Sequence, residues 1–479
     1  MPDIAELTLV DGVRIVVPDS LDLITPYVLR EQQDYFEDEL PFVRQVLQPG
    51  QKVIDIGANY GVYTLPMAKK VGAKGHVWAF EPSADTAQFL AKGIAANGFR
   101  NVTLEQKAVS SSAGIAQLSL HVHSELRAIV RGENPSGHSE NVSLVTLDDC
   151  MDLFGWQDID LVKIDAEGEE INIVSGGRRF FKNNAPLVQY ELRTNAADMN
   201  FALISHFEAI GYDSYCFLPG PNMLVPFDGN SPPDSYLLNL FCCSAARADQ
   251  LSKRGLLLRS CDLARGTQSL GPSASINTKY DWRSTLVQLP YAAPLISKWE
   301  LAGQSEDGAA IRQALAFYAC GRDVNLPMLV RFPALEASFR HLRALCQRNP
   351  SHLRLSTLAR VAHDYGQRGV VVSALAQLLE SMRSTGTFDP NEPFLPPLER
   401  FDSISPGEQL GGWILAAILE QLEQRERFSS FYAGASALQR LEIISALGFG
   451  SPGMKRRLEL VRLCIDRAQG ANSRGQPKP

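Results

Sequence analysis

The sequence lacks the surplus of basic residues that a nucleic-acid-binding protein needs. Its 479 residues include 46 Lys and Arg against 53 Asp and Glu, which gives a formal net charge of -7 at pH 7. Because binding to a phosphate backbone depends mainly on clustered positive charge, we expect no nucleic-acid partner.

Long apolar runs and closely spaced cysteines are scarce as well. No stretch of about 18 apolar residues is present, so we predict no membrane span. The beginning, "MPDIAELTLVDG", has no basic segment followed by an apolar one, so we expect no signal peptide. Of the eight cysteines only Cys242 and Cys243 are close together, and adjacent cysteines do not match zinc-ligand spacing. These features favour a cytoplasmic protein with free thiols.

The chain is too long for one ordinary hydrophobic core, and its composition and hydrophobic periodicity change along its length. We predict an N-terminal hairpin and helix (1–50) that pack on an α/β domain (51–248). A linker rich in Ser, Gly and Arg (249–295), a helical domain (296–470) and a disordered tail (471–479) follow.

The α/β domain is predicted from strands that alternate with helices. "KVIDIG", "HVWAFEP", "DLVKIDAEG" and "PLVQYEL" are short β-rich runs, each followed by a helical stretch. This alternation is typical of a doubly wound, mostly parallel sheet with crossover helices.

A glycine turn follows the first of these strands, in "KVIDIGANYGVYTLPMA". Gly57 is expected to let the backbone turn, and Gly61 to let it approach a ligand closely. The spacing is G-x-x-x-G, so the G-x-G-x-x-G fingerprint of pyrophosphate binding is missing. Asp55, just before the turn, would repel a phosphate and would suit a cationic amino-acid ligand.

The next strand ends in Glu81, whose carboxylate can accept hydrogen bonds from both hydroxyls of a ribose. The same stretch is also a good helix start, with Pro82 early and Ser83 able to cap, and the two roles are compatible. An acid before a glycine turn and a ribose acid one strand later describe a site for S-adenosylmethionine (SAM), a ligand with an ammonium, a sulfonium and a ribose but no phosphate.

Four motifs together resemble the FkbM-type methyltransferases over roughly residues 30–245. They are "VIDIGANYGVYT", "AFEP", "VKIDAEGEE" and "PLVQYEL", in this order. The matching positions are Asp55, Gly57, Ala58, Asn59, Gly61, Glu81, Pro82, Lys163, Asp165, Glu167, Gly168 and Glu169; Ala166 departs from the more usual apolar residue. The resemblance implies a class I Rossmann-like fold and SAM-dependent methylation of an oxygen, often a hydroxyl of a sugar or polyketide.

The predicted cofactor contacts come from the ends of the first strands and from the fourth. In class I methyltransferases the end of the third strand meets the adenine, through either backbone or side chain, which adds residues around Lys107. The full set is Asp55, Gly57, Ala58, Asn59, Gly61, Tyr63, Glu81, Pro82, Ser83, Gln106, Ala108 and Asp165.

Three acids are the candidates for catalysis: Asp165, Glu167 and Glu191. Asp165 and Glu191 each end a predicted strand, and Glu167 lies in the turn between strand and helix. An aliphatic hydroxyl is a poor nucleophile, and a base that accepts its proton contributes about 10²–10⁴-fold. Glu169 and Glu170 are expected only to complement a helix dipole. Asp165 and Glu191 holding a divalent metal is an alternative, but the sequence shows no third ligand, so no metal site is predicted.

Two further segments each allow two interpretations of their role. His121 and His123 would share one face of a strand, either as a solvated pair or as a base or metal ligand. The loop 131–143 is a substrate lid or a plain surface loop.

The helical domain is either an irregular bundle or a set of degenerate tetratricopeptide-like repeats. We expect it to bind a protein, present an acceptor or self-associate. The complete prediction is a SAM-dependent O-methyltransferase acting on a glycan or another small-molecule hydroxyl. A methyltransferase for a protein acceptor and a non-catalytic scaffold are the alternatives.

Overall fold

The computed structural model describes residues 3–130, 138–192, 199–263, 280–302, 306–385 and 388–474. The chain forms two compact units. The α/β unit comprises Met1–Phe217, Leu224–Asp228 and Leu237–Leu257. The helical unit comprises Leu218–Met223, Gly229–Tyr236 and Leu258–Pro479. Among the described residues, no helix is long and apolar enough to cross a bilayer.

An antiparallel hairpin starts the α/β unit, with β1 (Ile4–Thr8) paired to β2 (Arg14–Pro18). Two helices follow, α1 (Ile24–Gln32) and α2 (Glu39–Val46), where the sequence had indicated one. The break begins at Gln33, whose left-handed φ of 57° ends α1. The segment between the two helices contains Glu37, which accepts a hydrogen bond from Tyr63.

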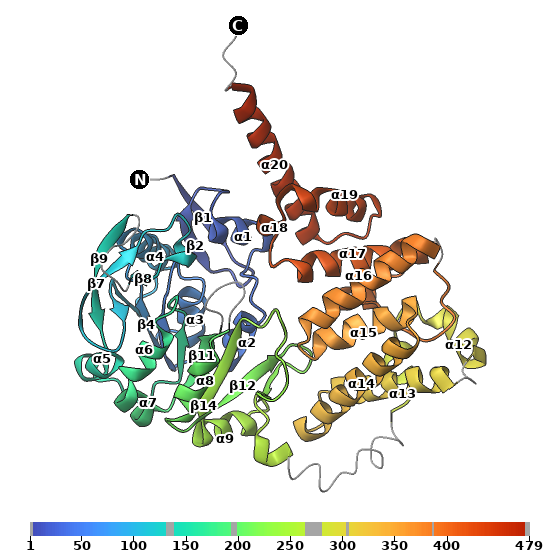
Figure 1. The fold of residues 1–479 in the computed structure, drawn as a ribbon, viewed down its shortest axis with the longest axis horizontal. Helices are drawn as coiled ribbons and strands as arrows, with labels where there is room; N and C mark the ends of the chain where they lie inside the picture. The colour runs from blue at the N-terminus through green and yellow to red at the C-terminus, as the bar shows by residue number, and fades with distance from the viewer. Residues whose placement is uncertain are drawn as a thin grey trace. The chain divides into compact units, whose positions relative to one another are not determined.

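The central sheet has eight strands in the order β13-β12-β14-β11-β10-β3-β4-β5 (Figure 1). Their bounds are β3 Lys52–Ile56, β4 His76–Phe80, β5 Val102–Glu105, β10 Leu161–Ile164, β11 Leu187–Glu191, β12 Tyr212–Leu218, β13 Met223–Pro226 and β14 Asn239–Ser244. The run from β11 to β5 is parallel, and β14 lies antiparallel to β11 and β12. The predicted Rossmann-like fold class is confirmed.

Alternation along the strands gives this sheet a core on each face. Val53 and Leu161 belong to one apolar cluster, whereas their neighbours Ile54 and Val162 belong to another. The covering helices are α3 Thr64–Val71, α4 Ala84–Asn97, α5 Leu147–Phe154, α6 Glu170–Ser175, α7 Arg178–Asn184, α8 Phe201–Glu208 and α9 Ala245–Lys253. The chain order reverses between β3 and β10, and open α/β sheets bind ligands at such a switch point.

A second, four-stranded sheet, of order β6-β9-β7-β8, is inserted between β5 and β10. Its strands are β6 Ala108–Val109, β7 Gly114–Ser119, β8 Ile129–Val130 and β9 Ser139–Val145. His121 and His123 were predicted on a strand, but they lie in the loop between β7 and β8. The glycine-rich loop predicted over 131–143 lies outside the described residues up to 137, and its remainder is part of β9.

The helical unit is built around Trp299, Trp413 and other large apolar side chains. Its elements are α11 Arg283–Leu286, η2 Ala293–Leu295, α12 Ile296–Ala302, α13 Glu306–Arg322, α14 Met328–Arg348, α15 His352–Asp364, α16 Arg368–Thr385, η3 Glu399–Ser403, α17 Leu410–Glu426, α18 Ser430–Ala433, η4 Gly434–Ala437, α19 Leu438–Ala446 and α20 Pro452–Arg474.

The structure differs from the sequence at both ends of this unit. The predicted linker, 249–295, begins inside α9, and Trp282, Leu286 and Tyr291 from its far end are buried in the helical core. The tail predicted from residue 471 is helical up to Arg474. Packing of these apolar side chains against distant helices decides the first boundary, and local composition does not reveal it.

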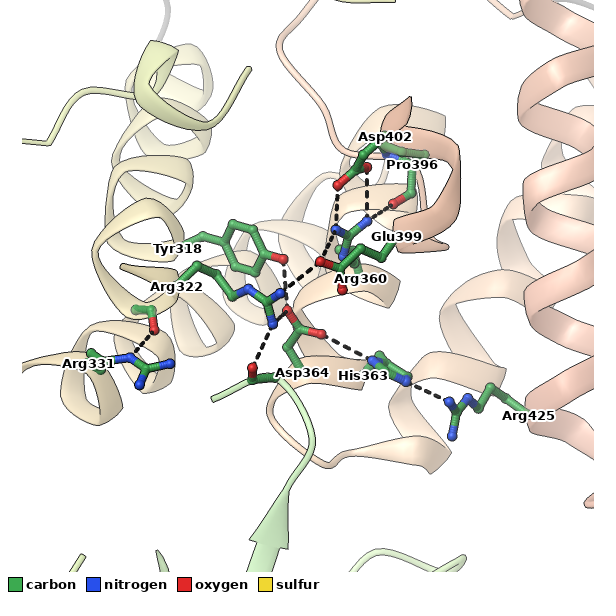
Figure 2. A network of polar contacts seen from close by, with 12 residues as sticks. Tyr318, Arg322, Arg331, Arg360, His363, Asp364, Pro396, Glu399, Asp402 and Arg425 are labelled. Atoms are coloured by element: carbon green, nitrogen blue, oxygen red, sulfur yellow. Dashed lines mark hydrogen bonds and ion pairs between the residues drawn. The ribbon is translucent and has the colours of Figure 1, made fainter. Parts of the chain in front are cut away.

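A network of ion pairs runs through the helical unit (Figure 2). Asp364 is 1% exposed and accepts hydrogen bonds from Tyr318 and His363, with Arg322 Nη1 at 3.1 Å. Arg360 is 3% exposed and holds Asp402 with both guanidinium nitrogens, at 3.2 and 2.7 Å. Buried charges of this kind are tolerated because each has a partner of opposite sign.

Candidate active site

The glycine turn after β3 lies at the switch point, as its position in the sheet order requires. Asp55 is fully buried, and its Oδ2 accepts a hydrogen bond from Thr64 Oγ1 at 2.5 Å. Its other oxygen, Oδ1, is buried without a hydrogen-bond partner among the described residues. Burial raises the pKa of Asp55, although Lys163 and Thr64 lower it. A buried carboxylate oxygen without a donor is costly unless a ligand supplies one.

Gly57 is required by both conformation and space. Its φ is 79°, and a Cβ there would lie 1.7 Å from the backbone oxygen of Asp165. The turn therefore packs directly on the end of β10. Asn59 also has a left-handed φ, 47°, which is uncommon outside glycine.

Gly61 has a packing role that was not predicted. Its φ is 90°, but a Cβ would meet Leu90 of α4 at 2.5 Å and Leu65 of α3 at 3.0 Å. The missing side chain therefore lets α3 and α4 pack closely. The expected approach of the Gly61 backbone to a ligand stays a prediction.

Glu81 follows β4 and is held by two backbone donors. Its Oε2 accepts from Asn59 N at 2.8 Å and its Oε1 from Ser83 N at 2.9 Å. Burial raises the pKa of Glu81 to about 7, while these two donors and Arg127 lower it. Ser83 does precede α4, but its side chain makes no capping hydrogen bond. The predicted cap is wrong because the hydroxyl is engaged by Arg127 instead.

The predicted adenine contacts after β5 are spread apart. Gln106 is exposed, and Lys107 pairs with Glu105 at 2.7 Å. Ala108 is buried in a small cluster with Leu118 and Val142, so its methyl group belongs to the core of the inserted sheet. A backbone contact is the role left to Ala108.

A row of polar side chains crosses three apolar strands. Asp55 in β3, Lys163 in β10 and Gln189 in β11 are paired in register, and alternation places all three on the same face. Lys163 Nζ lies 2.8 Å from Asp165 Oδ2 and 4.6 Å from the centre of the Tyr63 ring. Burial alone lowers the pKa of Lys163, but Asp165, Asp55 and Glu37 outweigh it and the pKa rises.

The structure brings the three predicted catalytic acids together. Carboxylate oxygens of Asp165, Glu167 and Glu191 all lie within 4.8 Å of one another. Burial raises the pKa of both Glu167 and Glu191, and neighbouring carboxylates raise both further. Such a group either shares protons or takes up a cation. The sequence showed no third ligand beside Asp165 and Glu191, whereas the structure supplies Glu167, whose φ is 48°.

The remaining acids of the motif stabilise the turn itself. Glu170 Oε1 accepts from the backbone N of Ala166 at 3.0 Å and of Gly168 at 3.2 Å. Glu169 accepts from Ser110 Oγ at 2.7 Å. These contacts fix the position of Glu167.

Sequence reasoning missed Glu37, which comes from the break between α1 and α2. Its Oε2 accepts from Tyr63 OH at 2.5 Å and from Asn239 Nδ2 at 3.1 Å. Burial raises the pKa of Glu37, and Lys163 opposes the shift. Tyr63, predicted as a cofactor contact, thus links Glu37 to Gln189, whose Nε2 donates to the phenol at 3.0 Å. Single polar residues within apolar strands were the available signal for Lys163 and Gln189, but nothing local singles out Glu37.

Comparison with known proteins identifies a methyltransferase domain in the α/β unit. The family model described as the methyltransferase FkbM domain matches residues 55–214, within the α/β unit. The predicted family resemblance is confirmed for this part of the chain. A comparison with curated proteins finds no match.

Three solved structures with similar folds are distant in sequence. The methyltransferase FkbM from Methylobacillus flagellatus is 16% identical over 43% of this chain and 48% of that chain, with a TM-score of 0.31. The alignment therefore spans about half of that protein. A SAM-dependent O-methyltransferase from Thermotoga maritima is 12% identical over 50% of this chain and 77% of that one, with a TM-score of 0.26. A putative methyltransferase from Streptococcus mutans in complex with SAH is 10% identical over 43% and 94%, also with a TM-score of 0.26.

Proposed function

We propose that the α/β unit binds SAM and transfers its methyl group to a hydroxyl oxygen of a small-molecule or glycan acceptor. The family match supports a methyltransferase domain, and we propose the cofactor, the reaction and the acceptor. The main observation behind these proposals is that Asp55 Oδ1 is buried without a hydrogen-bond partner among the described residues. Asp55 directly precedes the turn at position 57, where only glycine fits.

The residues present fit SAM better than a dinucleotide. Asp55 offers a buried acceptor to the ammonium of the methionine part, whereas it would repel a pyrophosphate. Glu81 is fixed by two backbone donors and keeps acceptor capacity for ribose hydroxyls. When bound, SAM supplies a methyl group already activated by the sulfonium.

The chain itself supplies orientation and a proton acceptor. Of the three clustered acids, Asp165 has its charge balanced by Lys163 at 2.8 Å. The raised pKa values of Glu167 and Glu191 favour their protonated forms. We assign Asp165 as the group that accepts the hydroxyl proton, with Glu167 and Glu191 orienting the acceptor by hydrogen bonds. The backbone oxygen of Asp165 packs against the Gly57 turn, and from this we propose that the base lies close to the cofactor.

The identity of the acceptor rests on the family resemblance. A sugar or secondary-metabolite hydroxyl is the proposed class, and a protein acceptor that the helical unit recruits is the alternative. A binding protein without catalysis is the other alternative, and it predicts SAM binding at most.

Calorimetric titration with SAM tests the proposal. We expect Asp55→Asn to weaken binding by at least about tenfold, because a charged hydrogen bond is worth roughly 1.5–3 kcal/mol. Asp213→Asn, at an exposed position of β12 in the same sheet, should bind as the intact protein does. NADH should give no signal. A folded protein that does not bind SAM would refute the proposal, and mass shifts of sugar, metabolite and protein acceptors would then separate the acceptor classes for a protein that does.

A further inference from the structure

The loop between β7 and β8 reaches from the inserted sheet to the proposed cofactor turn. It contains a short 3-10 helix, η1 (Ser124–Leu126). Glu125 Oε1 accepts a hydrogen bond from Thr25 N at 3.0 Å, at the start of α1. The loop is therefore anchored to the main body of the α/β unit and is more than a surface connection.

Arg127 joins this loop to the beginning of α4. Its Nη1 donates to Ser83 Oγ at 2.5 Å and to Thr86 Oγ1 at 3.1 Å. Its Nε donates to the backbone oxygen of His121 at 3.1 Å, which fixes the guanidinium within its own loop. Ser83 and Thr86 are 1% and 2% exposed, so the contact is protected from water.

Both backbone donors of Glu81 are held by side chains of this loop. Ser83, whose N–H donates to Oε1, is bound by Arg127. Asn59, whose N–H donates to Oε2, receives a hydrogen bond on its Oδ1 from Ser124 Oγ at 3.0 Å. Two residues of one inserted loop thus hold the two residues that hold the Glu81 carboxylate.

We propose that Ser124 and Arg127 are positioning residues of the cofactor site, which fix the Glu81 carboxylate for the ribose of SAM through Asn59 and Ser83. This inference rests on the proposed function. It assigns to the inserted sheet a part in cofactor binding that no motif of the sequence indicated. The side chains of Ser124 and Arg127 donate the four hydrogen bonds described above, and none of these is a backbone pairing of the sheet.

The charges around Glu81 provide a second readout. Burial raises its pKa to about 7, the backbone donors of Ser83 and Asn59 and the charge of Arg127 lower it, and Asp55 on β3 raises it. Tyr60 in the turn also faces it. Removal of Arg127 should raise the pKa of Glu81 further, so that more of the carboxyl is protonated at neutral pH. A protonated carboxyl has less acceptor capacity for two ribose hydroxyls.

The experiment is calorimetric titration of the full chain with SAM at pH 7 and pH 9. The variants are Arg127→Gln, Arg127→Lys and Ser124→Ala, with Arg179→Gln as the control. Arg179 is exposed on α7 and contacts Asp152 at 2.7 Å and the backbone oxygen of Asp148 at 3.2 Å, so its loss removes a surface charge and contacts to α5, and, among the described residues, none to the loop between β7 and β8. Each Kd is divided by that of the intact protein at the same pH, which cancels the titration of SAM itself.

We expect Arg127→Gln to weaken binding by about tenfold at pH 7, equivalent to about 1.4 kcal/mol, and by less at pH 9, where Glu81 is ionised in both proteins. Arg127→Lys should recover part of the loss, and Arg179→Gln should match the intact protein. Ser124→Ala, which keeps the charge, should weaken binding about threefold at both pH values, as expected for one neutral hydrogen bond.

The outcomes separate the two proposals. If the intact protein does not bind SAM, both fail. If it binds SAM and Arg127→Gln binds equally well, or is weakened by the same factor at both pH values without rescue by lysine, only the positioning role fails. If Arg127→Gln does not fold, unchanged binding by Ser124→Ala would overturn the inference and a threefold loss would support it.

Discussion

The requirement for glycine at position 57 yields the sharpest prediction, because the chain contains its own control. Gly57 and Gly72 both have positive φ, 79° and 65°, and both lie at an end of the segment that carries α3. A Cβ on Gly72 would meet nothing within 4 Å, whereas a Cβ on Gly57 would lie 1.7 Å from Asp165 O. Replacement of each by alanine separates conformational cost from loss of space.

The magnitudes follow from these two environments. Gly72 combines its φ of 65° with a ψ of -172°, a region essentially restricted to glycine. An alanine held in a backbone conformation of this kind costs about 1–3 kcal/mol, so both variants pay a conformational cost. At Gly57 the neighbour is backbone, and the alanine has to move it by about 1.7 Å to reach an ordinary contact of 3.4 Å. Overpacking adds about 1–3 kcal/mol. We therefore expect destabilisation of about 1–3 kcal/mol for Gly72→Ala and about 2–6 kcal/mol for Gly57→Ala.

Two measurements check this difference. In thermal unfolding, Gly72→Ala should lower the transition of the α/β unit by a few degrees and Gly57→Ala by about twice as much, at roughly 2–4 °C per kcal/mol. In titration with SAM, Gly72→Ala should bind normally and Gly57→Ala should bind at least about tenfold more weakly, because Asp165 and the turn both shift. Equal behaviour of the two variants in both assays would refute the reasoning.

Two further predictions concern titratable groups. The raised pKa of Glu191 favours a neutral carboxyl, so Glu191→Gln should retain most methyl transfer at pH 7 to 8, whereas Asp165→Asn should lose about 10²-fold or more; equal losses in transfer assays would contradict the assignment of Asp165 as the base. In the helical unit, burial raises the pKa of Asp364, but His363, Arg322 and Arg360 lower it to about 2. This depressed pKa contributes about 2 kcal/mol of stability above pH 4, lost as the pH falls toward 2. Asp364→Asn should therefore lower the unfolding midpoint at pH 7 about twice as much as at pH 3, and a pH-independent effect in denaturant titrations would contradict it.

The sequence predicted those residues of the site that lie within individual strand–turn–helix segments. Asp55 and Gly57 lie at the end of an apolar strand, and parallel strands bring Asp165 and Glu191 to the same edge. The chemistry of these residues follows from their order along the chain. The fold class was predictable for the same reason, since alternating strands and helices allow few topologies.

The parts that the sequence did not predict depend on segments that meet only in the folded chain. Glu37 reaches Tyr63 from a break between two helices, and Arg127 reaches Ser83 from a loop of the inserted sheet. Ser83 was predicted to cap α4, but the guanidinium of Arg127 engages its hydroxyl, and the packing of Gly61 against Leu90 was not predicted. Local spacing cannot show which distant side chain occupies the neighbouring space.

Two buried aspartates show why the ligand site is assigned to the edge between β3 and β10. Asp364 is 1% exposed, has Tyr318, His363 and Arg322 as partners, and its pKa is depressed. Asp55 is equally buried, but one of its oxygens has no donor among the described residues and its pKa is raised. Folding alone satisfies the first aspartate and leaves the second in need of a donor. Departures from polar satisfaction of this kind are expected where a protein binds a ligand, and here the departure coincides with the left-handed Asn59 and a cluster of acids. A cationic ligand would supply the donor that Asp55 lacks and would balance the charge of the clustered acids. This is the physical reason to place an ammonium and a sulfonium at this edge.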